Sequence, residues 1–302
     1  MSGYIHPGYA ESLAEFGTPR QLPRCGGWIL ERRIPEFSCS DATGCYPLFV
    51  CKDWSKLNTD LKTLENDLVS LSLVTDPFGN YDRNYLNQCF TDVVIPFKQH
   101  FVVDLNQQEK KYVSEHHRRY ARKALQRIHV ERSERPVDHI DDWVKLYEGL
   151  ISRHDIRGIS TFSRAAFARQ LKIPGLVMFR ALHEESTVGI LLWYVHEGVG
   201  YYHLGASNFL GYEMHASFAL FWHAIEYFEA TRLRWLDLGG GAGIKNNGTD
   251  GLSEFKRGWS NGFRAAYFCG RIFDHNKYAE IMMRKGLAGT NYFPGYRKGE
   301  RG

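Results

Sequence analysis

The order of helical and strand patterns in the second half of the chain limits its fold more than any other feature. Two helical patterns come first, over residues 136–153 and 162–171. Three strand patterns separated by short turns follow, over residues 176–182, 187–196 and 200–204. The chain continues with a helix, a strand, a short helix, a strand and a helix, over residues 214–230, 234–238, 253–259, 263–268 and 276–285. Hairpin strands followed by one helical crossover differ from the strict βα alternation of a doubly wound parallel sheet. We therefore expect an α/β (α+β) fold with a mixed sheet flanked by helices.

The first 106 residues carry shorter and less regular patterns. Leucines at helical spacing predict a helix within residues 53–67. Segments rich in β-branched and aromatic residues predict strands over residues 28–34, 46–51, 69–75, 90–95 and 100–105. We expect a small domain over residues 1–106, a larger one over 107–290, and a flexible polar tail over 291–302.

Composition and charge exclude several classes of protein. The hydrophobic share of 43% and the charged share of 24% are ordinary for a globular chain. A net charge of +4 is compatible with an anionic ligand but too weak to indicate a DNA-binding protein. The six cysteines form no CxxC pair, so we expect neither a zinc site nor a disulfide scaffold. The N-terminus lacks a signal-peptide pattern, and no apolar stretch approaches about 18 residues. We expect a cytoplasmic protein without a membrane span; the sequence does not indicate its oligomeric state.

A basic segment over residues 109–127 predicts an amphipathic helix. Its apolar residues lie along one helical face, and Arg118 and Arg122 lie on another together with Arg119 and Lys123. Such a face is either a solvated surface or a strip that binds phosphates, because the guanidinium fork matches phosphate oxygens. The same segment leaves open a non-catalytic RNA-binding module.

A glycine-rich stretch at residues 237–243 fits the DxGxGxG pattern of S-adenosylmethionine-dependent methyltransferases. In that fold the motif ends the first strand of a parallel sheet, and several βα units follow it. Only about 60 residues follow here, and residues 244–251 form turns more readily than a helix. A methyltransferase therefore remains an alternative function. Another interpretation of the glycines is that they let a substrate approach the backbone closely.

Four segments, read in order, resemble the FemAB-like acyltransferases of the GNAT superfamily, which include the aminoacyltransferases that form peptidoglycan bridges. They are the basic segment 117–125, the strand and apolar helix of 199–226, Leu-Asp-Leu-Gly-Gly at 236–240, and Gly-Leu-Ser-Glu-Phe-Lys at 251–256. The resemblance implies tandem GNAT-like folds, of which the first copy (1–106) is truncated and the second (107–290) is the acyltransferase domain. It also implies transfer of an acyl or aminoacyl group from a thioester or ester to an amine, without a covalent enzyme intermediate.

The resemblance implies that Phe255 and Lys256 lie near the acyl donor, and the chemistry of amide formation suggests roles for Lys256 and for further residues. Lys256 would supply positive charge to the oxyanion or to a donor phosphate, and Asp237 would orient or deprotonate the amine. His203, Tyr202 and Glu254 are further candidates for proton transfer or substrate binding. The remaining candidates for substrate binding are Phe255, Gly239, Gly240, Arg118 and Arg122.

The donor remains open between acyl-coenzyme A and aminoacyl-tRNA, and no tightly bound cofactor is expected. GNAT enzymes hold the coenzyme A pyrophosphate with a glycine-rich loop before the central helix. The corresponding segment here, residues 208–215, keeps a single glycine, Gly211. Helix-terminus amides could still bind a phosphate, so both donors stay possible.

Overall fold

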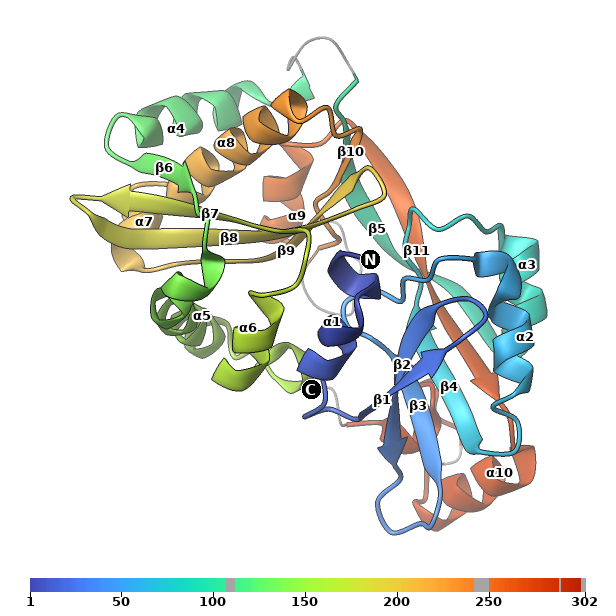
Figure 1. Cartoon of the computed structure of the whole chain (residues 1–302). Coiled ribbons are helices and arrows are strands. Elements are labelled where there is room, and N and C mark those ends of the chain that lie inside the picture. Colours follow the sequence, from blue (N-terminus) through green and yellow to red (C-terminus); the bar gives the residue numbers. More distant parts are fainter. Residues whose placement is uncertain (107–111, 242–249, 288, 300–302) are drawn as a thin grey trace. The chain divides into compact units, whose positions relative to one another are not determined.

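The computed structural model describes residues 1–106, 112–241, 250–287 and 289–299. These residues form two compact units, neither of which is continuous in sequence (Figure 1). Unit 1 contains Met1–Gly3, Lys98–Ile156 and Ser163–Arg264, and unit 2 contains Tyr4–Phe97, Arg157–Phe162 and Ala265–Gly302. The domain limits expected from sequence (1–106, 107–290 and 291–302) stay a prediction. The compact units divide the chain differently, because each unit combines segments from both halves of the sequence.

Unit 1 is built on a mixed sheet with the strand order β5-β10-β9-β8-β7-β6. The strands, in that order, are Val93–Asp104, Trp235–Asp237, Val199–Ser207, Ser186–His196, Leu176–His183 and His129–Arg132. The pair β9–β10 is parallel, and the other neighbours pair antiparallel. This arrangement confirms the predicted mixed sheet and differs from the parallel sheet of a methyltransferase.

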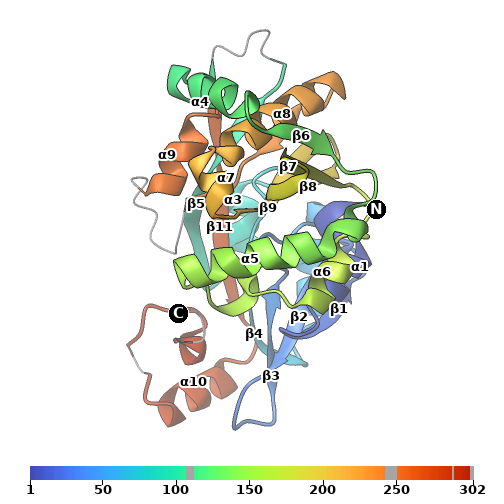
Figure 2. The same ribbon diagram turned by 90° about the vertical axis from the view of Figure 1, so that its left-hand side faces the viewer.

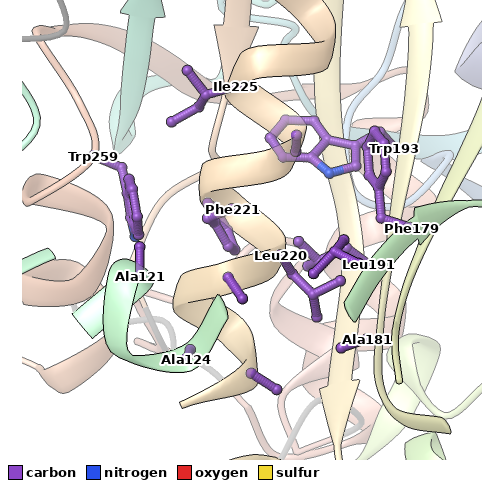
Figure 3. Packing of buried hydrophobic residues seen from close by; sticks show 14 of the residues in the cluster. Ala121, Ala124, Phe179, Ala181, Leu191, Trp193, Leu220, Phe221, Ile225 and Trp259 are labelled. Atoms are coloured by element: carbon purple, nitrogen blue, oxygen red, sulfur yellow. The ribbon is translucent and has the colours of Figure 1, made fainter. Parts of the chain in front are cut away.

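Helices cover both faces of this sheet. The view in Figure 2 shows α4 (Glu115–Leu125) and α8 (Ala216–Ala230) on one face, and α5 (Ile140–His154) and α6 (Arg164–Gln170) on the other. Helix α8 is apolar around most of its circumference because it lies between α4 and the strands. Figure 3 shows its side chains packed between alanines of α4 and residues of β7 and β8. The short helices of unit 1 are α7 (Phe209–Glu213), α9 (Gly251–Arg257) and the 3-10 turn η4 (Pro136–His139).

The strands of unit 2 follow the order β1-β2-β3-β4-β11, in which β3 and β4 pair parallel and the other neighbours pair antiparallel. These strands are Thr18–Leu22, Gly27–Arg33, Ser40–Gly44, Leu68–Val74 and Gly262–Ile272. One face packs a core of leucines and cysteines against α2 (Leu57–Lys62) and α3 (Arg83–Cys89). The other helical segments are α1 (Pro7–Ser12), α10 (His275–Arg284), η2 (Trp54–Lys56), η5 (Gly158–Ser160) and η6 (Gly295–Arg297).

The two units repeat one plan, and each is completed by a strand from the other half of the sequence. A parallel pair, β3–β4 in unit 2 and β9–β10 in unit 1, is joined by a helical connection in both. The strand that follows β4 in the chain, β5, pairs with β10, whereas the strand that follows β10, β11, pairs with β4. The first copy lacks counterparts of α5 and α6 before its strands. The repeated plan agrees with the predicted tandem arrangement, in which the first copy is truncated.

Three expectations for unit 2 were wrong in detail. The strand expected at 46–51 is reduced to one bridge at Phe49, and β3 lies earlier, in a polar segment with no run of β-branched residues. The strands expected at 90–95 and 100–105 form the single strand β5. The tail expected to be flexible from residue 291 is anchored within the described residues, because Tyr296 and Arg297 are buried.

Candidate active site

The glycine-rich turn after β10 is the centre of the candidate site. Strand β10 ends at Asp237, which pairs with Tyr201 of β9, and β9 continues beyond this point. Asp237 is buried, and its Oδ1 accepts a hydrogen bond from Gly239 N at 2.8 Å. Gly239 adopts φ +76°, a conformation that favours glycine. The turn is therefore held in one shape by the carboxylate that precedes it.

Two lysines donate to the backbone of this turn. Lys256 is 5% exposed, and its Nζ donates to Gly240 O at 2.6 Å. Lys98 Nζ donates to Gly241 O at 2.8 Å. A β-carbon on Gly240 would lie 2.7 Å from Lys98 Cδ, so a larger residue there would displace the lysine. The glycines thus leave room for two ammonium groups beside the turn.

Burial changes the proton affinity of both lysines. Desolvation lowers the pKa of Lys256 to about 7; Asp237 and Asp250 act in the opposite direction, and Lys98 lowers it further. Desolvation also lowers the pKa of Lys98. Lys256 can therefore gain or lose a proton near neutral pH, which is typical of residues that take part in catalysis.

His100 belongs to the same cluster, although the sequence did not indicate it. Its Nδ1 lies 2.9 Å from each carboxylate oxygen of Asp237, so the ring donates a hydrogen bond to that carboxylate. His100 and Lys98 stand two residues apart on β5, as side chains on one face of a strand do. Dividing β5 into two strands placed Lys98 in a loop, which hid this spacing.

Helix α9 brings Lys256 to the turn. Asp250 caps the helix by accepting from the amides of Leu252 and Ser253 at 3.0 Å each. Ser253 Oγ also donates to Asp250 Oδ2 at 2.6 Å. A β-carbon on Gly241 would lie 2.2 Å from Ser253 Oγ, so the first turn of α9 packs directly against the glycine turn. The last two residues of the DxGxGxG pattern, 242 and 243, lie outside the described residues.

Tyr202, another of the predicted residues, lies beside this cluster. The Lys256 Nζ is 5.4 Å from the centroid of the Tyr202 ring, within the range of a cation–π contact. Phe255 instead packs against Phe218 and Phe221 of α8, and Glu254 is exposed and pairs with Arg257. Roles for Phe255 and Glu254 in substrate binding stay predictions.

His203 lies in a different environment from Lys256. Its Nε2 is 3.3 Å from Gln170 Oε1 of α6, and its ring packs on Tyr194. Tyr202 packs on Trp193 and on α8 instead, so the side chains of Tyr202 and His203 lie on opposite faces of the sheet. Burial lowers the pKa of His203 to about 3, so the ring is neutral at physiological pH. A catalytic role for His203 stays a prediction without support from this geometry.

Arg118 and Arg122 lie on α4, one helical turn apart. Arg122 is exposed and Arg118 is half-buried. Helix α4 is tied to α9 through His117, whose Nε2 lies 2.9 Å from Phe255 O. The basic helix is therefore attached to the helix that carries Lys256, while its arginines are not within the lysine cluster.

The lowered pKa of Lys256 predicts a pH dependence of stability. An unfolded chain keeps the ordinary value of 10.5, whereas the folded chain has a value of about 7. Between these values the unfolded state binds one more proton, so the free energy of unfolding rises with pH, by at most ~1.4 kcal/mol per unit. Below about pH 7 the lysine is protonated in both states and contributes no slope.

Urea denaturation of wild type and Lys256→Met at about pH 7, 8 and 9 measures this contribution. We expect the stability of the wild type, relative to the variant, to increase with pH. Parallel pH dependences of the two proteins would contradict the burial of a titrating lysine.

Known proteins match part of this chain in sequence and most of it in fold. Residues 111–257 match the family described as an acetyltransferase (GNAT) domain. No curated protein matches the chain by sequence. The crystal structure of FemX superposes with a TM-score of 0.66 at 14% identity, covering 91% of this chain and 93% of FemX.

Two synthetase structures also superpose over most of their length. The C-terminal domain of a putative lysylphosphatidylglycerol synthetase from Agrobacterium fabrum gives a TM-score of 0.65 at 12% identity, covering 96% of this chain and 94% of that one. L-PGS from Bacillus licheniformis gives 0.60 at 13% identity, covering 94% and 98%.

Residues 111–257 therefore form an acyltransferase domain of the GNAT type. In fold, the chain is similar to FemX over nearly the whole of both chains. In the part of the chain that the structure describes, no helix is both long and apolar enough to cross a bilayer.

Proposed function

We propose that the protein forms an amide bond by transferring an acyl or aminoacyl group from an ester or thioester donor to an amine, which attacks the donor carbonyl directly. The observation that carries this proposal is the turn at Gly239–Gly241, to which the buried Lys256 and the half-buried Lys98 donate while Asp237 holds His100. Such a cluster offers both a positive charge and a proton acceptor in one water-poor place. Acyl transfer to an amine needs both.

Each group has a defined task in the proposed reaction. The amine nitrogen bonds to the carbonyl carbon and gives its proton to Nε2 of His100, whose ring Asp237 orients through Nδ1. Lys256 stabilises the oxyanion while the bond between carbon and the leaving oxygen or sulfur breaks. The leaving group then takes the proton from His100. This assignment differs from the sequence prediction, in which Asp237 itself orients or deprotonates the amine, because Asp237 here orients His100 as the base.

Aminoacyl-tRNA is the donor that the segment before α8 favours. The amides of residues 208, 211, 212, 214 and 215 already donate hydrogen bonds within the protein. A pyrophosphate loop would present such amides to the ligand. Gly211 is required for packing, because a β-carbon there would lie 2.2 Å from Val188 O. An aminoacyl ester on the terminal ribose of tRNA needs no such loop. Arg118 and Arg122 of α4 would contact phosphates of the tRNA backbone.

Radiolabel transfer tests both parts of the proposal. The purified protein is incubated with labelled aminoacyl-tRNA or labelled acetyl-coenzyme A, each with a peptidoglycan precursor, a peptide, an amino sugar or an aminolipid as acceptor. We expect label in an amide product from aminoacyl-tRNA. Label from acetyl-coenzyme A alone would refute the donor, and ester products or no transfer with any pair would refute amide formation. We propose that the reaction takes place in the cytoplasm.

A further inference from the structure

Unit 2 contains a cavity that the proposed reaction does not use. It has a volume of 460 Å³, which lies within the usual range of about 300–1,000 Å³ for small-molecule sites. All of the residues that line it belong to unit 2. Those that the argument uses are Arg32, Arg33, Thr43, Ser72, Tyr292 and Arg297.

A buried carboxylate fixes two of the arginines. Asp41 of β3 is 0% exposed, and the guanidinium groups of Arg32 and Arg297 both donate two hydrogen bonds to it, at 3.0–3.2 Å. Arg297 Nη2 also donates to Arg33 O at 2.8 Å. Because a guanidinium fork held by a carboxylate is pre-organised, both cations keep their place without a ligand. Asp41 therefore positions positive charge at this face of the sheet.

The charge of the cavity is not balanced by this network. Three arginines and one aspartate give +3 − 1 = +2 at the cavity and its immediate support. Arg33 is exposed, and no acidic partner for its guanidinium group occurs among the described residues. A group of this kind can bind an anion from solvent without first breaking an ion pair.

The floor of the cavity is polar although it is buried. Thr43 and Ser72 are paired across β3 and β4, and each is 3% exposed. A hydroxyl group has one donor and two acceptor positions, so hydroxyls that line a cavity can bond a polar ligand in addition to a partner within the protein. Tyr292, Phe293 and Phe16 supply apolar surface at the same cavity.

We propose that this cavity binds a small molecule that carries a phosphate or carboxylate group, which Arg33 and the Asp41-held arginines recognise while the hydroxyls and aromatic rings contact the rest. The inference is independent of the proposed chemistry at Lys256. It assigns the truncated copy of the fold a binding function of its own.

Calorimetric titration of the full chain in Tris-chloride tests the proposal, with glycerol 3-phosphate as the phosphate probe and succinate as the carboxylate probe. We expect saturable binding of one molecule per chain for at least one probe. Arg33→Gln should weaken it by roughly tenfold or more, the effect of losing one charged hydrogen-bond partner. Arg24→Gln removes the same charge from an exposed site of unit 2 that does not line the cavity, and should leave binding unchanged.

The probe that binds identifies whether the group is a phosphate or a carboxylate. No saturable binding of either probe, or equal losses in Arg33→Gln and Arg24→Gln, would overturn the proposal. Lys256→Met should bind the probe as the wild type does, so a failure of the transfer reaction and a failure of this site give different results.

Discussion

Lys256→Met is expected to lower the rate of acyl transfer by roughly 10²–10³-fold, the loss that follows removal of one group stabilising an oxyanion. The methionine keeps the length of the side chain but loses the ammonium that donates to Gly240 O. Since the lysine is buried and carries a lowered pKa, its replacement by an apolar side chain should not unfold the protein. Single-turnover transfer from the donor identified above measures the effect, and circular dichroism checks the fold.

The matched control is Lys145→Met on α5, an exposed lysine of the same unit. Its rate should remain within about twofold of the wild type, as expected for a surface substitution away from the site. A folded Lys256→Met protein with full turnover, or an equal loss in Lys145→Met, would refute the role of Lys256. An accompanying His100→Gln variant should also be slow, because the dyad with Asp237 would no longer accept a proton.

Asp41→Ala should destabilise the protein by about 3–5 kcal/mol, the cost of leaving buried charges without their partner. The carboxylate accepts from Arg32 and Arg297, which reach it from β2 and from η6 near the C-terminus. Both guanidinium groups would lose their carboxylate partner at once, and Arg297 would keep its bond to Arg33 O. Chemical denaturation measures the change.

Asp67→Ala is the control for this prediction. Asp67 pairs with Arg20, but its side chain is 49% exposed, so water and salt screen the interaction. We expect a change of at most ~1 kcal/mol. Equal effects of the two substitutions would show that burial does not set the strength of the Asp41 network.

The second half of the fold could be predicted from sequence because its patterns are long. Helix α8 and the three strands before it, β7, β8 and β9, begin and end within three residues of the positions that periodicity predicted. The first half was less predictable, since its strands are short and several carry polar residues on a buried face. Ser40–Gly44 is an example, because Asp41 and Thr43 are buried there through an ion-pair network and a cavity rather than through apolar packing.

The candidate site divides in the same way. Asp237, Gly240 and Lys256 lie within 20 residues of one another, so a short motif could bring them together. His100 meets Asp237 across 137 residues, through the pairing of β5 with β10. No local pattern encodes a strand partner at that distance, and the pairing therefore had to come from the structure.

The exchange of β5 and β11 between the two copies has a consequence for synthesis on the ribosome. Tyr267 of β11 donates to Thr75, which was made 192 residues earlier. At about 5–20 residues per second, roughly 10–40 s pass before the nascent β4 receives its partner. During that interval an unsatisfied strand edge is open to other chains or to a chaperone. Yield in cells should therefore depend on translation speed and chaperone supply.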